Sequence, residues 1–232
     1  AHQGRACENI LANAFVTPGS VAIMNYHFTT TKAHITRLGG SVEEVVGDDA
    51  LQTTSDNPFK GNFDMGKLKS EVDKVGAKNI SFVRIESGTN LIGGQPVSLA
   101  NMREVSKFCR ANGIMLVLDA SLLADNLYFI KTREQACMNM EIKDIVREMA
   151  DLMDIIYFSA RKLGCARGGG IITSNEEYCK KMRGFVPLYE GFLTYGGMSV
   201  REMEAIAVGI KETLDINVIN QTPLFVEALG KE

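Results

Sequence analysis

The sequence predicts an α/β domain with a largely parallel, buried sheet. Three observations support this prediction. Apolar runs of strand length alternate with amphipathic helical stretches, glycines stand where helices should end, and polar residues follow the apolar runs. The chain has 232 residues, of which 45% are hydrophobic and 23% are charged. This composition is that of a globular protein and suffices for one large domain with its own core.

In the N-terminal part of the chain, residues 4–15 carry apolar side chains every three or four positions, which predicts a helix. A short strand is expected at 42–46, followed by a polar segment at 48–61 that we expect to be an exposed loop. A helix is expected over 64–75. Asp64 is placed to cap it, because a carboxylate at this position accepts hydrogen bonds from the free amides of the first turn.

Strands and helices continue to alternate in the rest of the chain. An amphipathic helix over 98–112 is closed by Gly113, since glycine readily adopts the left-handed backbone that ends many helices. The other expected elements are strands at 80–85, 114–118, 155–158 and 170–173, and helices at 141–150 and from residues 200 and 223 onward.

Charge and cysteine usage exclude several classes of function. The net charge is −3 and the basic residues are scattered, which argues against partners such as nucleic acid or a membrane surface. The apolar runs are far shorter than a membrane span. The five cysteines lie far apart without a C-x-x-C pair, which predicts reduced thiols in a cytoplasmic protein and neither a disulfide framework nor a metal site.

The two ends of the chain suggest a portion of a longer protein. The sequence begins at Ala1 without a methionine and stops at Glu232, within the last expected helix. Neither end carries a helix-stop signal.

The main candidate for chemistry is a lysine, Lys162, which follows the expected strand 155–158. Asp119 directly follows the earlier strand 114–118. This pair suits an enzyme that holds pyridoxal phosphate, in which a lysine forms the Schiff base and an aspartate keeps the pyridine nitrogen protonated. On spacing alone, a surface lysine after a buried strand is the ordinary alternative.

Several polar residues follow the ends of expected strands. Asp119, Ser159 and Lys162 all do so, and Asn90 comes a few residues after the strand at 80–85. In open α/β sheets, ligands bind outside the carboxyl ends of the strands. The convergence of these residues is a stronger signal than any one of them.

Two further motifs add candidate binding residues. Gln3, Gly4 and Arg5 precede or open the first helix, where backbone amides and an arginine make an anion site. Phe28 could stack on a heteroaromatic ring. A plain helix start and a core aromatic residue are the alternatives. The glycines at 168–170 lack the spacing of a nucleotide-binding loop.

Taken together, these segments resemble one family, the β-eliminating carbon–carbon lyases, which include tryptophanase and tyrosine phenol-lyase. The matching stretches are HQGRACEN, FTTTKAH, PFKGNFD, TNLIGGQPVSLANMREV, LDASLLADNLYFI, SARK and YEGFLTYGGMSVREMEAIAVGI. They occur in the family's order and cover essentially the whole chain.

The resemblance implies a fold-type I pyridoxal-phosphate enzyme of the aspartate aminotransferase kind, with a mostly parallel mixed sheet between helices. Residues 1–232 would form the central part of the large cofactor-binding domain, without the family's N-terminal segment and C-terminal small domain. Catalytic roles are implied for Lys162 and Asp119. Cofactor contacts are implied for Gln3, Gly4, Arg5, Phe28, Asn90, Asp119, Ser159 and Lys162, and substrate contacts for Thr29 and Asn90.

The activity implied by the resemblance is β-elimination of an aromatic L-amino acid in a homo-oligomer, either a dimer or a tetramer. Conversion of tryptophan to indole, pyruvate and ammonia is favoured over tyrosine cleavage by the stretches 58–64 and 194–198. The alternatives are another β-elimination or a C–S lyase, and a non-catalytic module with the same fold.

The chain departs from the family pattern near the expected cofactor. Leu122 stands where the family usually has an arginine, and Leu163 stands where it has an aspartate. Without that arginine, control of the Schiff-base proton should depend more on Asn90. Arg167 falls near the family's potassium site, where its charge is expected to repel or replace the ion.

Overall fold

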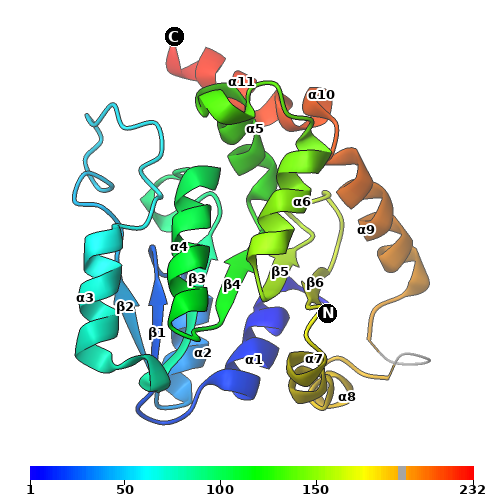
Figure 1. Ribbon diagram of the computed structural model, residues 1–232. Coiled ribbons are helices and arrows are strands. Elements are labelled where there is room, and N and C mark those ends of the chain that lie inside the picture. The colour runs from blue at the N-terminus through cyan, green and yellow to red at the C-terminus, as the bar shows by residue number, and fades with distance from the viewer. Residues whose placement is uncertain (193–196) are drawn as a thin grey trace.

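The computed structural model describes residues 1–192 and 197–232. A central sheet lies between helices on both of its faces (Figure 1). The strands are β1 (Val21–Met24), β2 (Ser41–Glu44), β3 (Ile80–Glu86), β4 (Leu116–Asp119), β5 (Ile155–Ser159) and β6 (Gly169–Ile172). Their order in the sheet is β2-β1-β3-β4-β5-β6, and only the pairing of β5 with β6 is antiparallel in this six-stranded sheet. The predicted mostly parallel mixed sheet is confirmed.

The register of the sheet brings polar residues to one edge. Glu86, the last residue of β3, is the Cα partner of Asp119, the last residue of β4. Asp119 is in turn the partner of Tyr157 in β5. Because these strands are parallel, their carboxyl ends meet at this edge, where ligands bind in such folds.

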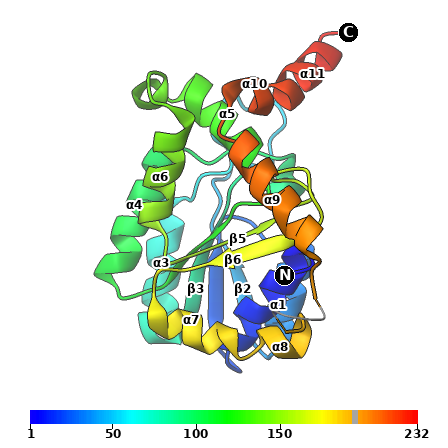
Figure 2. The ribbon, with the colours of Figure 1, turned by 90° about the vertical axis from the view of Figure 1, so that its right-hand side faces the viewer.

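Helices cover the sheet in two layers, which Figure 2 shows edge-on. One apolar core contains residues of α3, α4, α5 and α6, and the other contains residues of α1, α2 and α7. The helices are α1 (Gly4–Phe15), α2 (Thr29–Arg37), α3 (Met65–Val75), α4 (Leu99–Ala111), α5 (Leu123–Arg133), α6 (Ile142–Leu152), α7 (Glu176–Arg183), α8 (Val186–Tyr189), α9 (Val200–Glu212), α10 (Ile216–Ile219) and α11 (Gln221–Gly230).

Successive residues of the central strands enter opposite cores. In β4, Leu116 and Leu118 belong to the core under α4 and α6, and Val117 belongs to the core under α1. Burial on both faces explains why these strands are continuous apolar runs instead of alternating ones.

The helices and strands expected from the sequence are confirmed within a few residues. Asp64 caps α3 as predicted, with its Oδ1 accepting hydrogen bonds from the amides of Gly66 (2.8 Å) and Lys67 (3.0 Å). The expected exposed loop at 48–61 needs a correction, because Phe59 and Lys60 near its end are buried. The elements β1, α2, α5, α7, α8 and α10 were not anticipated. No helix in the described ranges is long and apolar enough to cross a membrane.

Candidate active site

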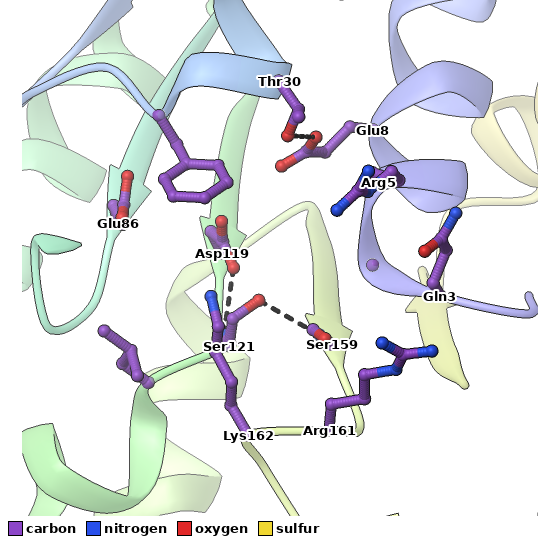
Figure 3. A pocket seen from close by; sticks show the side chains of 13 residues that line it. Gln3, Arg5, Glu8, Thr30, Glu86, Asp119, Ser121, Ser159, Arg161 and Lys162 are labelled. Atoms are coloured by element: carbon purple, nitrogen blue, oxygen red, sulfur yellow. Dashed lines mark hydrogen bonds between the residues drawn. The ribbon is translucent and has the colours of Figure 1, made fainter. Parts of the chain in front are cut away.

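A pocket opens at the carboxyl ends of β3, β4 and β5, and Figure 3 shows the side chains around it. Most of the residues predicted for the site meet here. The pocket is lined by Gln3, Gly4, Arg5, Glu8, Phe28, Thr30, Glu86, Asp119, Ser121, Leu122, Ser159, Arg161 and Lys162.

One side of the pocket is suited to an anion. Helix α1 begins at Gly4, and its first turn contains no acidic residue, so the partial positive charge of its amides is not neutralised there. Arg5 and Arg161 lie on the same side (Figure 3). A Cβ on Gly4 would lie 2.8 Å from the Cβ of Ser159, so only glycine lets the helix approach this closely. This arrangement fits a phosphate group.

Lys162 and Phe28 face each other across the pocket. The Nζ of Lys162 lies 5.1 Å from the centroid of the Phe28 ring, which is within the range of a cation–π contact. Lys162 lies in the turn after β5, where its backbone amide donates to the carbonyl of Ser159 (3.2 Å). A flat heteroaromatic ring bound here would have an aromatic face to stack on and an amine within reach.

Asp119 is a buried carboxylate in a fixed orientation. Its Oδ1 accepts a hydrogen bond from the amide of Ser121 (2.9 Å). Its Oδ2 accepts from the Tyr157 hydroxyl (3.0 Å) and from Nη2 of Arg84 (2.5 Å). Asp119 also lines the pocket, so this oriented carboxylate is accessible to a ligand bound there.

Arg84 is fully buried beneath the pocket and joins two carboxylates. Its Nη1 donates to Oε2 of Glu86 (3.0 Å), its Nη2 donates to Asp119, and its Nε donates to the Tyr157 hydroxyl (2.7 Å). Burial acts to lower the pKa of Arg84, but Tyr157, Glu86 and Asp119 hold that pKa well above its usual value. Arg84 is therefore a permanent positive charge in this network.

Glu86 was missed by the sequence analysis, and it lines the pocket. Its Oε1 accepts a hydrogen bond from the amide of Asn90 (3.0 Å), and its Oε2 accepts from Arg84. Burial raises the pKa of Glu86, while Arg84 acts in the opposite direction. The signal that could have revealed it is the pair of charges at alternate positions, Arg84 and Glu86, inside a mostly apolar strand.

Glu8 ties α1 to the start of α2. It is buried, and its two oxygens accept hydrogen bonds from the hydroxyls of Thr30 (2.5 Å) and Thr31 (2.8 Å). These bonds fix the position of Phe28, which directly precedes α2.

The structure brings together most of the predicted site residues but not all of them. Gln3, Gly4, Arg5, Phe28, Asp119, Ser159 and Lys162 line the pocket. Asn90 and Thr29 are not among the described residues that line it. Asn90 opens a short 3-10 helix, Asn90–Ile92, and its amide supports Glu86; Thr29 is the first residue of α2. Their contacts with cofactor or substrate stay predictions.

The three residues that depart from the family pattern lie in different parts of the structure. Leu122 lines the pocket, and Leu163 is buried in the core. Arg167 is largely exposed and its Nε lies 3.3 Å from Oε1 of Glu202 in α9. Of the stretch 194–198, residues 194–196 lie outside the described residues.

The residues of this pocket fit pyridoxal phosphate. Gly4 and Arg5 would hold its phosphate, Phe28 would face its ring, Asp119 would bind its nitrogen, and Lys162 would supply the amine. The close approach of Gly4 to Ser159, which a Cβ would prevent, is the structural feature that supports this fit most directly.

The fold and this pocket define an aminotransferase-like class of α/β proteins. Residues 1–218 match the family described as beta-eliminating lyase, and the chain belongs to this family. It is 40% identical to a tyrosine phenol-lyase from Clostridium tetani over 99% of this chain and 50% of that protein. It is 41% identical to the Pasteurella multocida tyrosine phenol-lyase, over 94% of this chain and 48% of that one. The chain thus spans about half the length of the curated relatives it matches.

Solved structures show the same fold at low sequence identity. Bna3p from Saccharomyces cerevisiae matches with a TM-score of 0.67 and 17% identity, over 95% of this chain and 49% of that one. CalE6 from Micromonospora echinospora, a cystathione gamma lyase, matches with a TM-score of 0.59 and 14% identity, over 92% and 46% respectively. Both confirm the predicted fold class.

Proposed function

We propose that this chain forms the pyridoxal-phosphate-binding part of a lyase that performs β-elimination on an aromatic L-amino acid. The observation that carries the proposal is the meeting of an anion site, an aromatic ring, a buried carboxylate and a lysine amine in one pocket. When bound, pyridoxal phosphate supplies the electron sink that stabilises the substrate after its α-proton is removed.

The anion site would fix the cofactor in position. In this proposal, Gly4 and Arg5 bind the phosphate together with Gln3 and Ser159. The amides of the first helical turn and the guanidinium are charge-matched to a phosphate, and charge-assisted hydrogen bonds of this kind are strong.

Lys162 would have two tasks. Its Nζ would hold the cofactor covalently, and as a free amine it would accept the α-proton of the substrate as the general base. Phe28, whose ring centroid lies 5.1 Å from this Nζ, would pack against a face of the cofactor ring.

Asp119 would keep a proton on the pyridine nitrogen. The hydrogen bonds from Ser121 and Tyr157 orient its carboxylate. A carboxylate that is already oriented needs no reorganisation when charge develops in the ring, and this lowers the barrier to α-proton removal.

The proposal also concerns which aromatic amino acid is the substrate. The names of the relatives support tyrosine, which would give phenol, pyruvate and ammonia. The stretches 58–64 and 194–198 favour tryptophan, which would give indole instead. A homo-oligomeric assembly also belongs to the proposal.

The first test concerns the lysine. The protein is incubated with pyridoxal phosphate, its visible absorbance is recorded, and the adduct is reduced with borohydride and located by peptide mass spectrometry. We expect one adduct, on Lys162. Lys162→Ala should lose it, because no other amine is held opposite Phe28 in the described pocket.

Lys143→Ala is the matched control, since Lys143 is exposed on α6, and it should keep the adduct. An adduct of unchanged stoichiometry in Lys162→Ala would show that the lysine is wrongly assigned. Release of pyruvate is then assayed with tyrosine, tryptophan and S-substituted cysteines. Turnover of S-substituted cysteines alone would favour the C–S lyase, and cofactor binding without turnover would favour a non-catalytic module.

A further inference from the structure

We propose that Glu86 is a second carboxylate of the cofactor site and that, together with Asp119, it raises the affinity of the bound cofactor for protons. This inference rests on the proposed function, since it concerns bound pyridoxal phosphate. It assigns a role to a residue for which the sequence analysis found none.

Glu86 lies at the pocket edge that faces away from the anion site. It ends β3 beside Asp119, its Cα partner in β4, and both residues line the pocket. In Figure 3, Glu86 lies on one side of Asp119, and Gln3, Arg5 and Arg161 lie on the other. Glu8 also lies beside Arg5, so that side has two arginines and one carboxylate and is net cationic, whereas the side with Glu86 is anionic.

The shape of the cofactor matches this division. Its phosphate and its phenolic oxygen are attached on opposite sides of the pyridine ring. With the phosphate held on the cationic side near Arg5, the side of the ring with the phenolic oxygen would be directed toward Glu86. The imine proton of a lysine-bound cofactor is shared with that oxygen, so a nearby negative charge favours the protonated form.

The hydrogen bonds of Glu86 are those of an ionised carboxylate. Both oxygens accept, one from the amide of Asn90 and the other from Arg84. The buried group formed by Glu86, Asp119 and Arg84 thus has two negative charges and one positive charge. A proton on the cofactor supplies the missing positive charge.

The other titratable groups around Glu86 do not remove this imbalance. Burial raises the pKa of the Tyr157 hydroxyl well above its usual value, so this side chain on β5 stays neutral. Glu8 on α1 lines the same pocket and adds negative charge, whereas Arg5 and Lys162, which also line it, would be engaged by the phosphate and the imine of a bound cofactor.

Leu122 adds no positive charge to the anionic side beyond that of Arg84. It lines the pocket at the start of α5, and its Cβ would lie 2.7 Å from a Cβ placed on Gly88, two residues after Glu86. The side chain in contact with this turn is therefore apolar, and Arg84, which Glu86 shares with Asp119, is the cation paired with Glu86 among the described residues.

The test is a spectroscopic titration that does not depend on turnover. The wild-type protein is loaded with pyridoxal phosphate and its visible absorbance is followed from acid to alkaline pH. Glu86→Gln keeps the shape and the acceptor oxygen but removes the charge. We expect its titration midpoint to fall by about one pH unit or more.

Two comparisons separate charge from structure. Glu86→Asp retains the charge and should titrate close to wild type, while Glu86→Asn repeats the neutral change in the shorter side chain. Glu148→Gln removes a carboxylate that pairs with Arg103 (2.6 Å) outside the pocket, and its midpoint should not move. Unbound cofactor is removed before the titration, so the midpoint reports the cofactor held by the protein.

The outcomes separate this inference from the proposed function. A visible band with equal midpoints in wild type and both neutral variants would overturn the role of Glu86 and leave the cofactor assignment intact. Absence of a visible band in wild type would overturn both. A downward shift in the neutral variants, with Glu86→Asp near wild type, is the expected result.

Discussion

At the scale of single residues, the site depends on Arg84, a charged residue inside strand β3. Arg84 has no exposed surface, and a buried guanidinium is tolerated only when its donors are paired with acceptors. Its partners Asp119 and Tyr157 lie 35 and 73 residues away along the chain. The network therefore links β3 to β4 and β5 and holds Asp119 in its orientation.

Tyr157→Phe tests this network. The substitution leaves the Nε of Arg84 without its acceptor and removes one of the hydrogen bonds to Oδ2 of Asp119. We expect the free energy of unfolding to fall by about 1–3 kcal/mol, because a buried donor without an acceptor loses its hydration and gains nothing in return. The measurement is urea unfolding followed by circular dichroism.

Tyr178→Phe is the control for the loss of a tyrosine hydroxyl. Tyr178 is only partly buried and packs edge-on against Phe15, with ring centroids 5.5 Å apart. Its substitution should change stability by no more than about 0.5 kcal/mol, as for other changes away from buried networks. Equal losses in the two variants would contradict the role given to Tyr157.

The residues of the site differ in how well the sequence predicts them. Lys162, Asp119 and the Gln3–Arg5 segment were predicted because each stands at the end of a strand or the start of a helix, which local pattern reveals. Arg84 and Glu86 were missed because their role depends on partners in neighbouring strands. The sequence alone does not contain the register that pairs Glu86 with Asp119.

At the scale of elements, the turn that carries Lys162 is held by helix α9. Gly209 of α9 touches Gly164, two residues after Lys162, so closely that a Cβ on Gly209 would lie 1.9 Å from the carbonyl oxygen of Gly164. Glycine is required at this crossing because any side chain would push the helix and the turn apart.

Gly209→Ala should therefore displace the turn and weaken cofactor binding. The expected loss of stability is about 1–3 kcal/mol, the usual range for an extra methyl group in a packed contact. Both effects are measured, the first by titration with pyridoxal phosphate and the second by urea unfolding. The opposite result, unchanged affinity and stability, would mean that α9 does not position Lys162.

Gly230→Ala is the matched control. Gly230 also lies in a helix, at the end of α11, and a Cβ there meets nothing within 4 Å. Alanine is the better helix former, so this variant should be neutral or slightly more stable.

Elements were predicted well where the sequence carries a local signal. The capping residue Asp64 predicted helix α3, and the regular apolar spacing of residues 4–15 predicted helix α1. Helix α2 was missed because it begins with three threonines, which are poor helix formers. It forms because Glu8 accepts hydrogen bonds from Thr30 and Thr31, a contact between distant parts of the sequence.

At the scale of the whole molecule, both cores contain buried thiols, and two of them have strongly raised pKa values. Cys7 lies in the core under α1, and Cys109 lies in the core under α4. Burial raises the pKa of each thiol from 9.0 to about 12, because the core does not solvate a thiolate. In the unfolded chain, both groups are in water and lose their protons near pH 9.

Because of this difference, the free energy of unfolding falls as the pH becomes alkaline. Between pH 9.0 and about 12 the unfolded state releases the two protons while the folded state keeps them. The folded state then binds more protons than the unfolded state, so its stability falls as pH rises. Below pH 9.0 both states hold the protons, and the contribution of the thiols is complete.

The double variant Cys7→Ala, Cys109→Ala should lose stability less steeply over this pH range. The difference in slope from wild type is about 1.4 kcal/mol per pH unit for each thiol. Urea unfolding at a series of alkaline pH values measures it. Lysines and tyrosines titrate equally in both proteins, and Cys179→Ala, which removes an exposed thiol, should follow wild type. Parallel curves for the double variant and wild type would show that the two cores do not keep their thiols protonated.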